Sequence, residues 1–211
     1  MTRISQAALP RRFYARRADE VARELLGCVL LRRYRRSLLA GRIVETEAYV
    51  GEEDQACHAR SGRTKRNAVM YGPPGHAYVY FIYGMYDMLN VVCQPAGKPE
   101  AVLLRALEPL DGVETMRRLR GVAGHPKRLA DGPGKLCRAL AVTRRQNGID
   151  LLGEQLWIAS GALAASESVQ RSARIGVDYA GVDAARLLRF FIGGNEHVSR
   201  LPASRRRRPQ R

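Results

Sequence analysis

Short runs in which apolar and β-branched residues alternate with polar ones predict that strands dominate the chain. The clearest runs cover residues 28–35, 38–49, 77–83, 86–93 and 100–107, and weaker ones cover 156–159, 174–177 and 190–192. Gly84 is a natural turn residue between two of these runs. Residues 77–93 are therefore predicted to form a β-hairpin with its tip near Tyr83 and Gly84.

Four segments are predicted to be helical. Asp19 would cap a helix over residues 20–26 that ends at Gly27, and Asp54 would cap a short helix reaching His58. Two more helices are predicted over residues 112–119 and 134–142. Strands come in clusters without regular βαβ alternation, which predicts a single α+β domain with a mainly antiparallel sheet.

The chain carries a large excess of positive charge. Its 211 residues contain 36 Lys and Arg against 20 Asp and Glu, for a formal net charge of +16. This favours a polyanionic partner. Only four of the cations are Lys. The planar guanidinium group of arginine can bind a phosphate through two hydrogen bonds. Genomic base composition can also produce an excess of Arg over Lys.

Most of this charge lies at the two ends of the chain. Residues 1–36 hold ten Arg and three acids, and residues 200–211 hold six Arg and no acid, so these ends supply thirteen of the sixteen excess charges. We expect the ends to attract phosphates without regard to sequence and in a salt-sensitive way.

Composition also excludes several classes of protein. An apolar fraction of 45% argues against a wholly disordered chain, and no run of 18 apolar residues predicts a membrane span. Residues 1–17 lack the apolar core of a secretory signal, so an intracellular protein is expected. The cysteines are far apart and predict neither disulfides nor a zinc site: Cys28, Cys57, Cys93 and Cys137. No metal or cofactor is expected.

One predicted strand face carries two acids and an aromatic residue. Side chains alternate along a strand, so Glu45, Glu47 and Tyr49 share one face of the 38–49 strand. We interpret Glu45 as a solvated residue at a sheet edge. Glu47, next to an aromatic residue and just ahead of the loop that holds His58, is a candidate general base.

Five of the nine tyrosines lie within sixteen residues: Tyr71, Tyr78, Tyr80, Tyr83 and Tyr86. Cross-strand packing accounts for Tyr78 and Tyr86. It accounts poorly for Tyr83, because a hairpin tip has little core to enter. An aromatic residue there could stack on an unpaired base or wedge between base pairs.

Two other features invite a functional interpretation. Arg105 stands between leucine-rich segments of the 100–107 strand. If buried it needs a partner, for which Glu47 is a candidate, but it could equally extend to solvent at an edge. The Gly132-Pro133-Gly134-Lys135 turn is not a Walker A loop, yet its N–H groups could hold one DNA phosphate.

Six segments, in this order and spacing, resemble the alkyladenine (3-methyladenine/methylpurine) DNA glycosylase family over about residues 12–200. They are GRIVETEAYVG (41–51), HARSGRTKRN (58–67), YVYFIYGMYDMLNVV (78–92), AVLLRALEP (101–109), GPGKLCRAL (132–140) and F-x-I-G-G-N-x-x-V-S (190–199). The chain departs from the family near Leu188, where a Trp is expected.

The resemblance implies a glycosylase domain over residues 12–200, with a curved sheet and a protruding hairpin that inserts into DNA. Residues 1–11 would be a basic extension, and residues 201–211 a disordered Arg-rich tail. The implied activity is monofunctional: a flipped-out alkylated or deaminated purine (3-methyladenine, 7-methylguanine, hypoxanthine or ethenoadenine) is hydrolysed from double-stranded DNA, leaving an abasic site. The protein would be a monomer that needs no cofactor, cytoplasmic in a bacterium and nuclear in a eukaryote.

The same resemblance implies a role for each matching residue. Glu47 matches the catalytic base and Arg105 the arginine beside the catalytic water. The flipped base would be enclosed by Tyr49, His58 and Tyr80, with Asn90 crowding the amino group of normal guanine. Tyr83 would fill the space left in the duplex, and DNA phosphates would contact Arg66, Gly134 and Lys135.

Two other classes of protein stay open at this point. A non-catalytic nucleic-acid binder would use the same aromatic and Arg residues, but it has no use for Glu47 among them. A metal-dependent nuclease would need a cluster of metal ligands that the sequence does not display.

Overall fold

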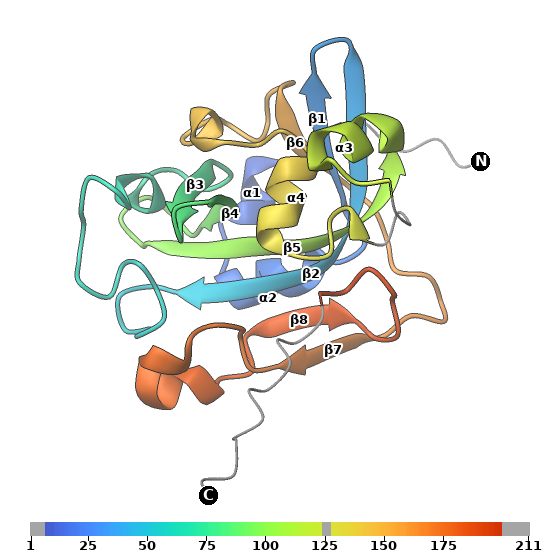
Figure 1. Cartoon of the computed structure of the whole chain (residues 1–211). Helices are drawn as coiled ribbons and strands as arrows, with labels where there is room; N and C mark the ends of the chain where they lie inside the picture. The colour runs from blue at the N-terminus through green and yellow to red at the C-terminus, as the bar shows by residue number, and fades with distance from the viewer. Residues whose placement is uncertain (1–6, 124–127, 200–211) are drawn as a thin grey trace, which may run out of the picture.

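A computed structural model describes residues 7–123 and 128–199 of the chain. Its sheet is built around two long antiparallel strands, β2 (Ser37–Val50) and β5 (Glu100–Asp111), which run side by side through the centre of the molecule (Figure 1). β1 (Val29–Tyr34) and β6 (Leu156–Ala159) extend the sheet beyond β2. β4 (Tyr86–Cys93) and β3 (Ala77–Ile82) extend it beyond β5, which gives the order β3-β4-β5-β2-β1-β6.

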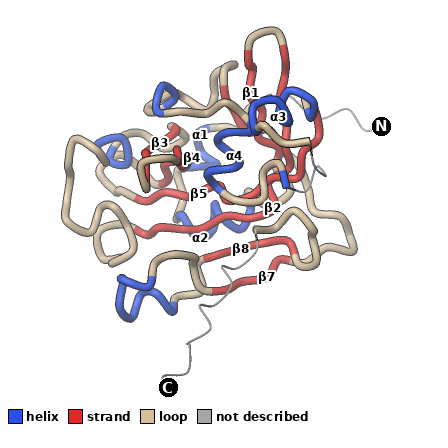
Figure 2. The backbone as a smooth tube through the Cα atoms, viewed as in Figure 1, coloured by secondary structure: helices blue, strands red, loops and turns tan. Residues whose placement is uncertain are grey.

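Two short C-terminal strands complete the sheet. β8 (Arg189–Ile192) pairs with β7 (Val169–Ser172) and also with residues 45–47 of β2. The first part of β2 therefore pairs with β1 and its later part with β8, so the sheet curls (Figure 2). All these pairings are antiparallel, and the predicted single-domain α+β class is confirmed.

The helices are short and cover the sheet. α1 (Arg11–Tyr14) and α2 (Ala18–Glu24) precede β1, and α2 packs on β2 and β5. α3 (Val113–Arg120) and α4 (Pro133–Ala139) follow β5, and α4 packs on β4 and β5. The connections include 3-10 segments such as η1 (Ala68–Tyr71), η3 (Arg144–Gln146) and η4 (Asp178–Ala185). Within the described residues, no helix is long and apolar enough to cross a membrane.

The hydrophobic core has one large part and a smaller one near the hairpin. The large part contains the apolar side chains of α2 and α4 and the sheet residues beneath them, such as Leu30, Val44 and Leu104. Leu188, at the place where a Trp was expected, is 8% exposed and belongs to this part. A separate cluster includes Cys57, Met70 and Tyr78, which line the cavity described below.

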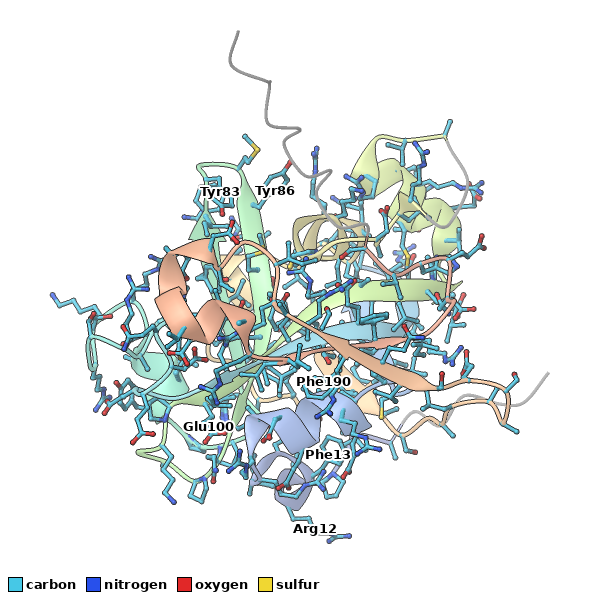
Figure 3. The ribbon with its side chains drawn as sticks, turned by 90° about the horizontal axis from the view of Figure 1, so that it is seen from below. Arg12, Phe13, Tyr83, Tyr86, Glu100 and Phe190 are labelled. Carbon is cyan, nitrogen blue, oxygen red and sulfur yellow. The ribbon has the colours of Figure 1, made fainter. Side chains whose placement is uncertain are left out.

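The predicted hairpin is confirmed, with Ile82 paired to Tyr86 across its tip. Tyr83 and Gly84 both have positive φ, at 55° and 67°, and the N–H of Met85 donates to the carbonyl of Ile82. Consecutive positive φ angles match the right-handed twist of the flanking strands. The hairpin places Tyr83 and Tyr86 at the end of the molecule opposite Arg12 and Phe13 (Figure 3).

Three local predictions are wrong. The first α2 residue is Ala18, and Asp19 lies inside the first turn, where it accepts hydrogen bonds from Arg17 rather than capping the helix. No helix follows Asp54: the next residues form turns, and its carboxylate pairs with Arg174 as well as accepting from the N–H of Ala56. The strand predicted over residues 174–177 instead occupies Val169–Ser172.

The chain already packs on the sheet near its N-terminus. Ala8 forms a bridge with Ala159, and the N–H of Leu9 donates to the carbonyl of Ile158. Leu9 is buried, so these residues of the predicted basic extension contribute to the core. The predicted Arg-rich tail, residues 201–211, lies outside the described residues.

Candidate active site

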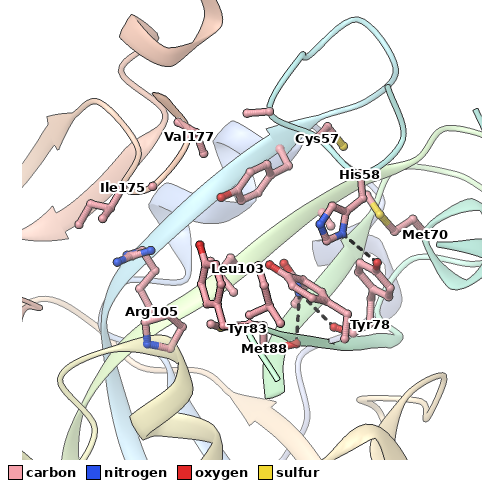
Figure 4. Close-up of a pocket in the computed structure, with 18 of the residues that line it drawn as sticks. Cys57, His58, Met70, Tyr78, Tyr83, Met88, Leu103, Arg105, Ile175 and Val177 are labelled. Atoms are coloured by element: carbon pink, nitrogen blue, oxygen red, sulfur yellow. Dashed lines mark hydrogen bonds between the residues drawn. The ribbon is translucent and has the colours of Figure 1, made fainter. Parts of the chain in front are cut away.

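An aromatic cavity of about 330 Å³ opens beside the β3–β4 hairpin (Figure 4). Its walls come from the end of β2, from the 56–58 loop, from β3–β5 and from residues 175–179. Among its lining residues are Tyr49, His58, Tyr78, Tyr80, Tyr83, Asn90, Arg105, Pro133, Ile175 and Tyr179. Six of the ten predicted site residues line this one cavity, although they come from segments far apart in the sequence.

Two compensating bulges bring the acids and the arginine of the site to one face. Ile43 pairs with Leu107 and Thr46 with Leu104, but between them Glu45 pairs with Ala106. One extra residue on each strand, Val44 on β2 and Arg105 on β5, is left without a direct partner there. A bulge redirects side chains, and here the Arg105 guanidinium reaches the acids of β2.

Glu47 is fully buried and held by three contacts. Its Oε2 accepts a 2.9 Å hydrogen bond from the hydroxyl of Tyr49 and lies 3.3 Å from Nη1 of Arg105. Its Oε1 accepts a 2.7 Å hydrogen bond from the backbone N–H of Ile175. A carboxylate offers about four acceptor positions, so Oε1 keeps one unused position, although the side chain is closed off from solvent.

Glu45 is not the solvated edge residue that the sequence pattern predicted. It is fully buried, because β8 and the residues after it cover this part of β2. Its Oε1 accepts from Nε of Arg105 at 2.9 Å and from Nε of Arg189 at 2.7 Å. Ser199 donates to it as well, through both its backbone N–H and its hydroxyl. Glu45 therefore anchors Arg105 from the side away from Glu47.

Arg105 is 6% exposed and joins the two acids, so it does not extend to solvent. Burial alone would lower its pKa. The charges of Glu47 and Glu45 outweigh burial and raise the pKa of Arg105 instead. The guanidinium is therefore a permanent positive charge at the base of the cavity.

Aromatic rings form the walls of the cavity. The His58 and Tyr80 rings meet edge to face with centroids 4.4 Å apart, and Nδ1 of His58 lies 2.9 Å from the Tyr78 hydroxyl. Burial, followed by the charges of Arg66 and Arg60, lowers the pKa of His58 to about 4. Burial raises the pKa of Tyr78 to about 12. At neutral pH His58 is therefore uncharged and Tyr78 keeps its proton.

Tyr49 and Asn90 complete the walls. Burial and the neighbouring Glu47 raise the pKa of Tyr49 well above its ordinary value, so its hydroxyl is a donor. Asn90 is 3% exposed, and its side-chain nitrogen donates to the carbonyls of Tyr78 and Met88. These bonds fix the amide at the cavity surface.

Tyr83 differs from the other aromatic residues because it is 71% exposed at the hairpin tip. It combines this exposure with a positive φ, which costs a non-glycine residue about 1–2 kcal/mol. Stability does not explain an exposed aromatic ring on a strained backbone. Such residues are characteristic of functional positions.

The residues predicted to contact phosphates lie around the cavity rather than in it. Arg66 is exposed, and its guanidinium lies 5.4 Å from the centroid of the Tyr80 ring. Gly134 is buried, and a Cβ there would lie 2.6 Å from the Tyr86 ring, so close packing explains this glycine. Nζ of Lys135 pairs with Asp131 at 2.9 Å.

Two buried arginines near the site, Arg174 and Arg189, were not predicted from the sequence. Arg189 shares Glu45 with Arg105, and Arg174 forms a two-pronged ion pair with Asp54. Arg189 follows a leucine pair just as Arg105 does, a signal that was available in the sequence. Within the described ranges, no three His, Cys, Asp or Glu residues gather where they could hold a metal ion.

Comparison with known proteins identifies the family. The Methylpurine-DNA glycosylase (MPG) family model matches residues 12–196. The chain belongs to this family. It is accordingly a DNA N-glycosylase, an enzyme of alkylation-damage repair that acts on DNA.

Curated members of the family are similar over nearly their whole length. A protein of Methanocella arvoryzae is 51% identical over 193 residues, which cover 91% of this chain and 96% of the relative. A Carboxydothermus hydrogenoformans protein is 49% identical over 91% of this chain and 98% of its own. A Myxococcus xanthus protein is 47% identical over 95% of this chain and 98% of its own length. Each is named "Putative 3-methyladenine DNA glycosylase".

Proposed function

We propose that this glycosylase is monofunctional and hydrolyses alkylated or deaminated purines from double-stranded DNA. The observation that carries the proposal is the buried Glu47 carboxylate, held against Arg105 beside an aromatic cavity. Its substrates would be 3-methyladenine, 7-methylguanine, hypoxanthine and ethenoadenine. The protein would act as a monomer and leave an abasic site.

The exposed ring of Tyr83 supports a base-flipping step. The target bond lies inside a stacked duplex, so the nucleotide must swing out at a cost of a few kcal/mol. Tyr83 would offset part of this cost by stacking where the base had been. The cavity would then receive the flipped purine.

The aromatic walls favour damaged purines. Alkylation at a ring nitrogen leaves 3-methyladenine or 7-methylguanine positively charged, and a cationic ring is attracted to tyrosine faces. Tyr49, Tyr80 and His58 would enclose it. Asn90, fixed by two backbone carbonyls, would crowd the amino group of normal guanine.

Glu47 would carry out the hydrolysis. As the N-glycosidic bond breaks, its electron pair leaves with the base and positive charge develops on the sugar. An ionised carboxylate stabilises this charge and accepts a proton from the attacking water, as in glycoside hydrolysis. Oε1 of Glu47 has the free acceptor position this water needs, while Arg105 keeps the carboxylate oriented.

A neutral base such as hypoxanthine needs a hydrogen bond to leave, and His58 would supply it. We propose that the protonated Tyr78 hydroxyl donates to Nδ1 of His58, which lies 2.9 Å away. This assigns the imidazole proton to Nε2. A neutral His58 would then be a donor toward the purine.

The lysine distribution supports a hydrolytic rather than a lyase mechanism. A lyase needs an amine nucleophile, but among the described residues none that lines the cavity is Lys. Arg66, Gly134 and Lys135 would instead contact phosphates outside it, and the arginines at the chain ends would add salt-sensitive attraction.

A base-release panel tests this function. Duplexes that each carry one of the four lesions are incubated with excess protein, and free base and strand integrity are followed. We expect release of at least one damaged purine, with strand breakage only after hot alkali. No release from any duplex that the protein binds, or strand breakage without alkali, would refute the proposal.

A further inference from the structure

Arg174 is wholly buried and connects three segments that form the cavity. Its Nη1 and Nη2 atoms donate to the two oxygens of Asp54 at 2.5 and 2.8 Å. Nη1 also donates to the carbonyl of Ala48 on β2, and Nη2 to the carbonyl of Asp183 in η4. A single guanidinium therefore ties together the end of β2, the loop after it and η4.

Arg174 is also next to the two groups that hold the Glu47 carboxylate. Its guanidinium lies 4.9 Å from the centroid of the Tyr49 ring, whose hydroxyl donates to Glu47. The following residue, Ile175, supplies the backbone N–H that donates to the other Glu47 oxygen. A shift of Arg174 would therefore disturb both bonds at once.

Asp54 extends the same connection toward His58. Besides Arg174, it accepts hydrogen bonds from the N–H groups of Val50 and Ala56. Burial alone would raise the pKa of Asp54, but the hydrogen bonds and charge of Arg174 outweigh burial and lower it. The carboxylate thus stays ionised and keeps the loop that precedes His58 in place.

We propose that the buried Asp54–Arg174 ion pair is the positioning element of the active site. It holds the Tyr49 ring and the Ile175 N–H in the geometry that orients Glu47. Neither member of the pair touches the substrate. This inference rests on the proposed role of Glu47.

The energetics of the pair favour a positioning role over a purely stabilising one. A buried ion pair contributes little net stability compared with well-packed apolar residues. Arg174 moreover leaves its buried Nε without a hydrogen bond among the described residues, which adds a cost. The planar guanidinium donates to both Asp54 oxygens and to two backbone carbonyls at once. A lysine ammonium cannot make these four hydrogen bonds.

The test compares two variants of the pair with a matched control. Arg174→Lys keeps the charge but loses the fork, and Asp54→Asn keeps the shape but loses the charge. Arg42→Lys is the control, because Arg42 lies on the same β2 strand and pairs with Glu108 and Glu167 away from the cavity. Single-turnover excision is measured over a range of enzyme concentrations, with urea unfolding of each protein.

We expect both pair variants to lower the saturating excision rate by about tenfold or more, since misplacement by about 1 Å can cost about 100-fold. The half-saturating enzyme concentration should change much less than the rate, and Arg42→Lys, whose folding is checked in the same urea series, should retain the wild-type rate. A wild-type rate in either pair variant, an equal loss in the control, or unfolding of both pair variants would overturn the proposal. Absence of base release by the wild type would instead refute the proposed function.

Discussion

The hydroxyl of Tyr49 donates a 2.9 Å hydrogen bond to Oε2 of Glu47, two residues earlier on the same strand. Strand alternation places both side chains on one face, so a wall of the cavity and the candidate catalytic carboxylate are directly linked. A base that stacks on Tyr49 would rest on the residue that also orients Glu47.

Replacing Tyr49 with Phe separates these two roles. The ring that would contact the base remains, while the hydrogen bond to Glu47 is lost. A hydrogen bond to a charged group is worth about 1.5–3 kcal/mol, so single-turnover excision should fall by about tenfold or more. Affinity for lesion DNA should hold, as measured by fluorescence anisotropy. Normal excision with weakened lesion binding would show that the hydroxyl does not orient Glu47.

Glu45 is expected to be essential for stability. Glu45→Gln leaves Arg105 and Arg189 buried without a carboxylate between them. Breaking a buried ion pair costs about 3–5 kcal/mol, which urea unfolding would detect. A surface residue would change the free energy of unfolding by less than about 0.5 kcal/mol, so a change that small would contradict the buried network.

His58 is expected to make stability depend on pH. In the unfolded chain a histidine titrates near pH 6.5, whereas burial and nearby arginines lower the pKa of folded His58 to about 4. Between these values the unfolded state binds more protons, so stability falls as the pH drops from about 6.5 toward about 4.

Urea unfolding at pH 7 and pH 5 measures this effect. The wild type should lose about 1–2 kcal/mol more than His58→Gln over this interval, because the variant lacks the titrating group. Equal losses in the two proteins would show that folded His58 has an ordinary pKa.

Tyr83 is expected to matter for lesion binding more than for undamaged DNA. Stacking of an aromatic ring is worth about 1–3 kcal/mol, so Tyr83→Ala should weaken lesion binding by roughly fivefold to 150-fold. Tyr83→Asn is a useful companion, since Asn tolerates the positive φ of this turn. Both variants should lose the preference for lesion DNA over undamaged DNA to the same extent. If Asn restores it, turn geometry rather than the ring accounts for the effect.

The sequence predicts those parts of the molecule that depend on local pattern. Alternation locates the strands, Gly84 locates the hairpin tip, and the face shared by Glu47 and Tyr49 follows from period two. The resemblance to the family motifs predicts six further site residues, and the structure brings all of them to one cavity: Tyr49, His58, Tyr80, Tyr83, Asn90 and Arg105.

What the sequence does not predict depends on contacts between distant segments. Glu45 looks like a solvated edge residue until β8 and Ser199 cover it from the far end of the chain. Asp54 resembles a helix cap because its partner, Arg174, lies 120 residues away. The bulge at Arg105 is equally invisible, since register appears only when β2 and β5 pair.

The central claim is that Glu47 performs the hydrolysis, and single-turnover excision by Glu47→Gln tests it most directly. The substitution keeps the shape of the side chain but removes the charge and the proton acceptor. Loss of a general base costs about 10²–10⁴-fold in rate, so excision from a duplex from which the wild type releases the base should fall at least about 100-fold while lesion binding persists. A near-normal excision rate in this variant would contradict the account and place the catalytic base elsewhere.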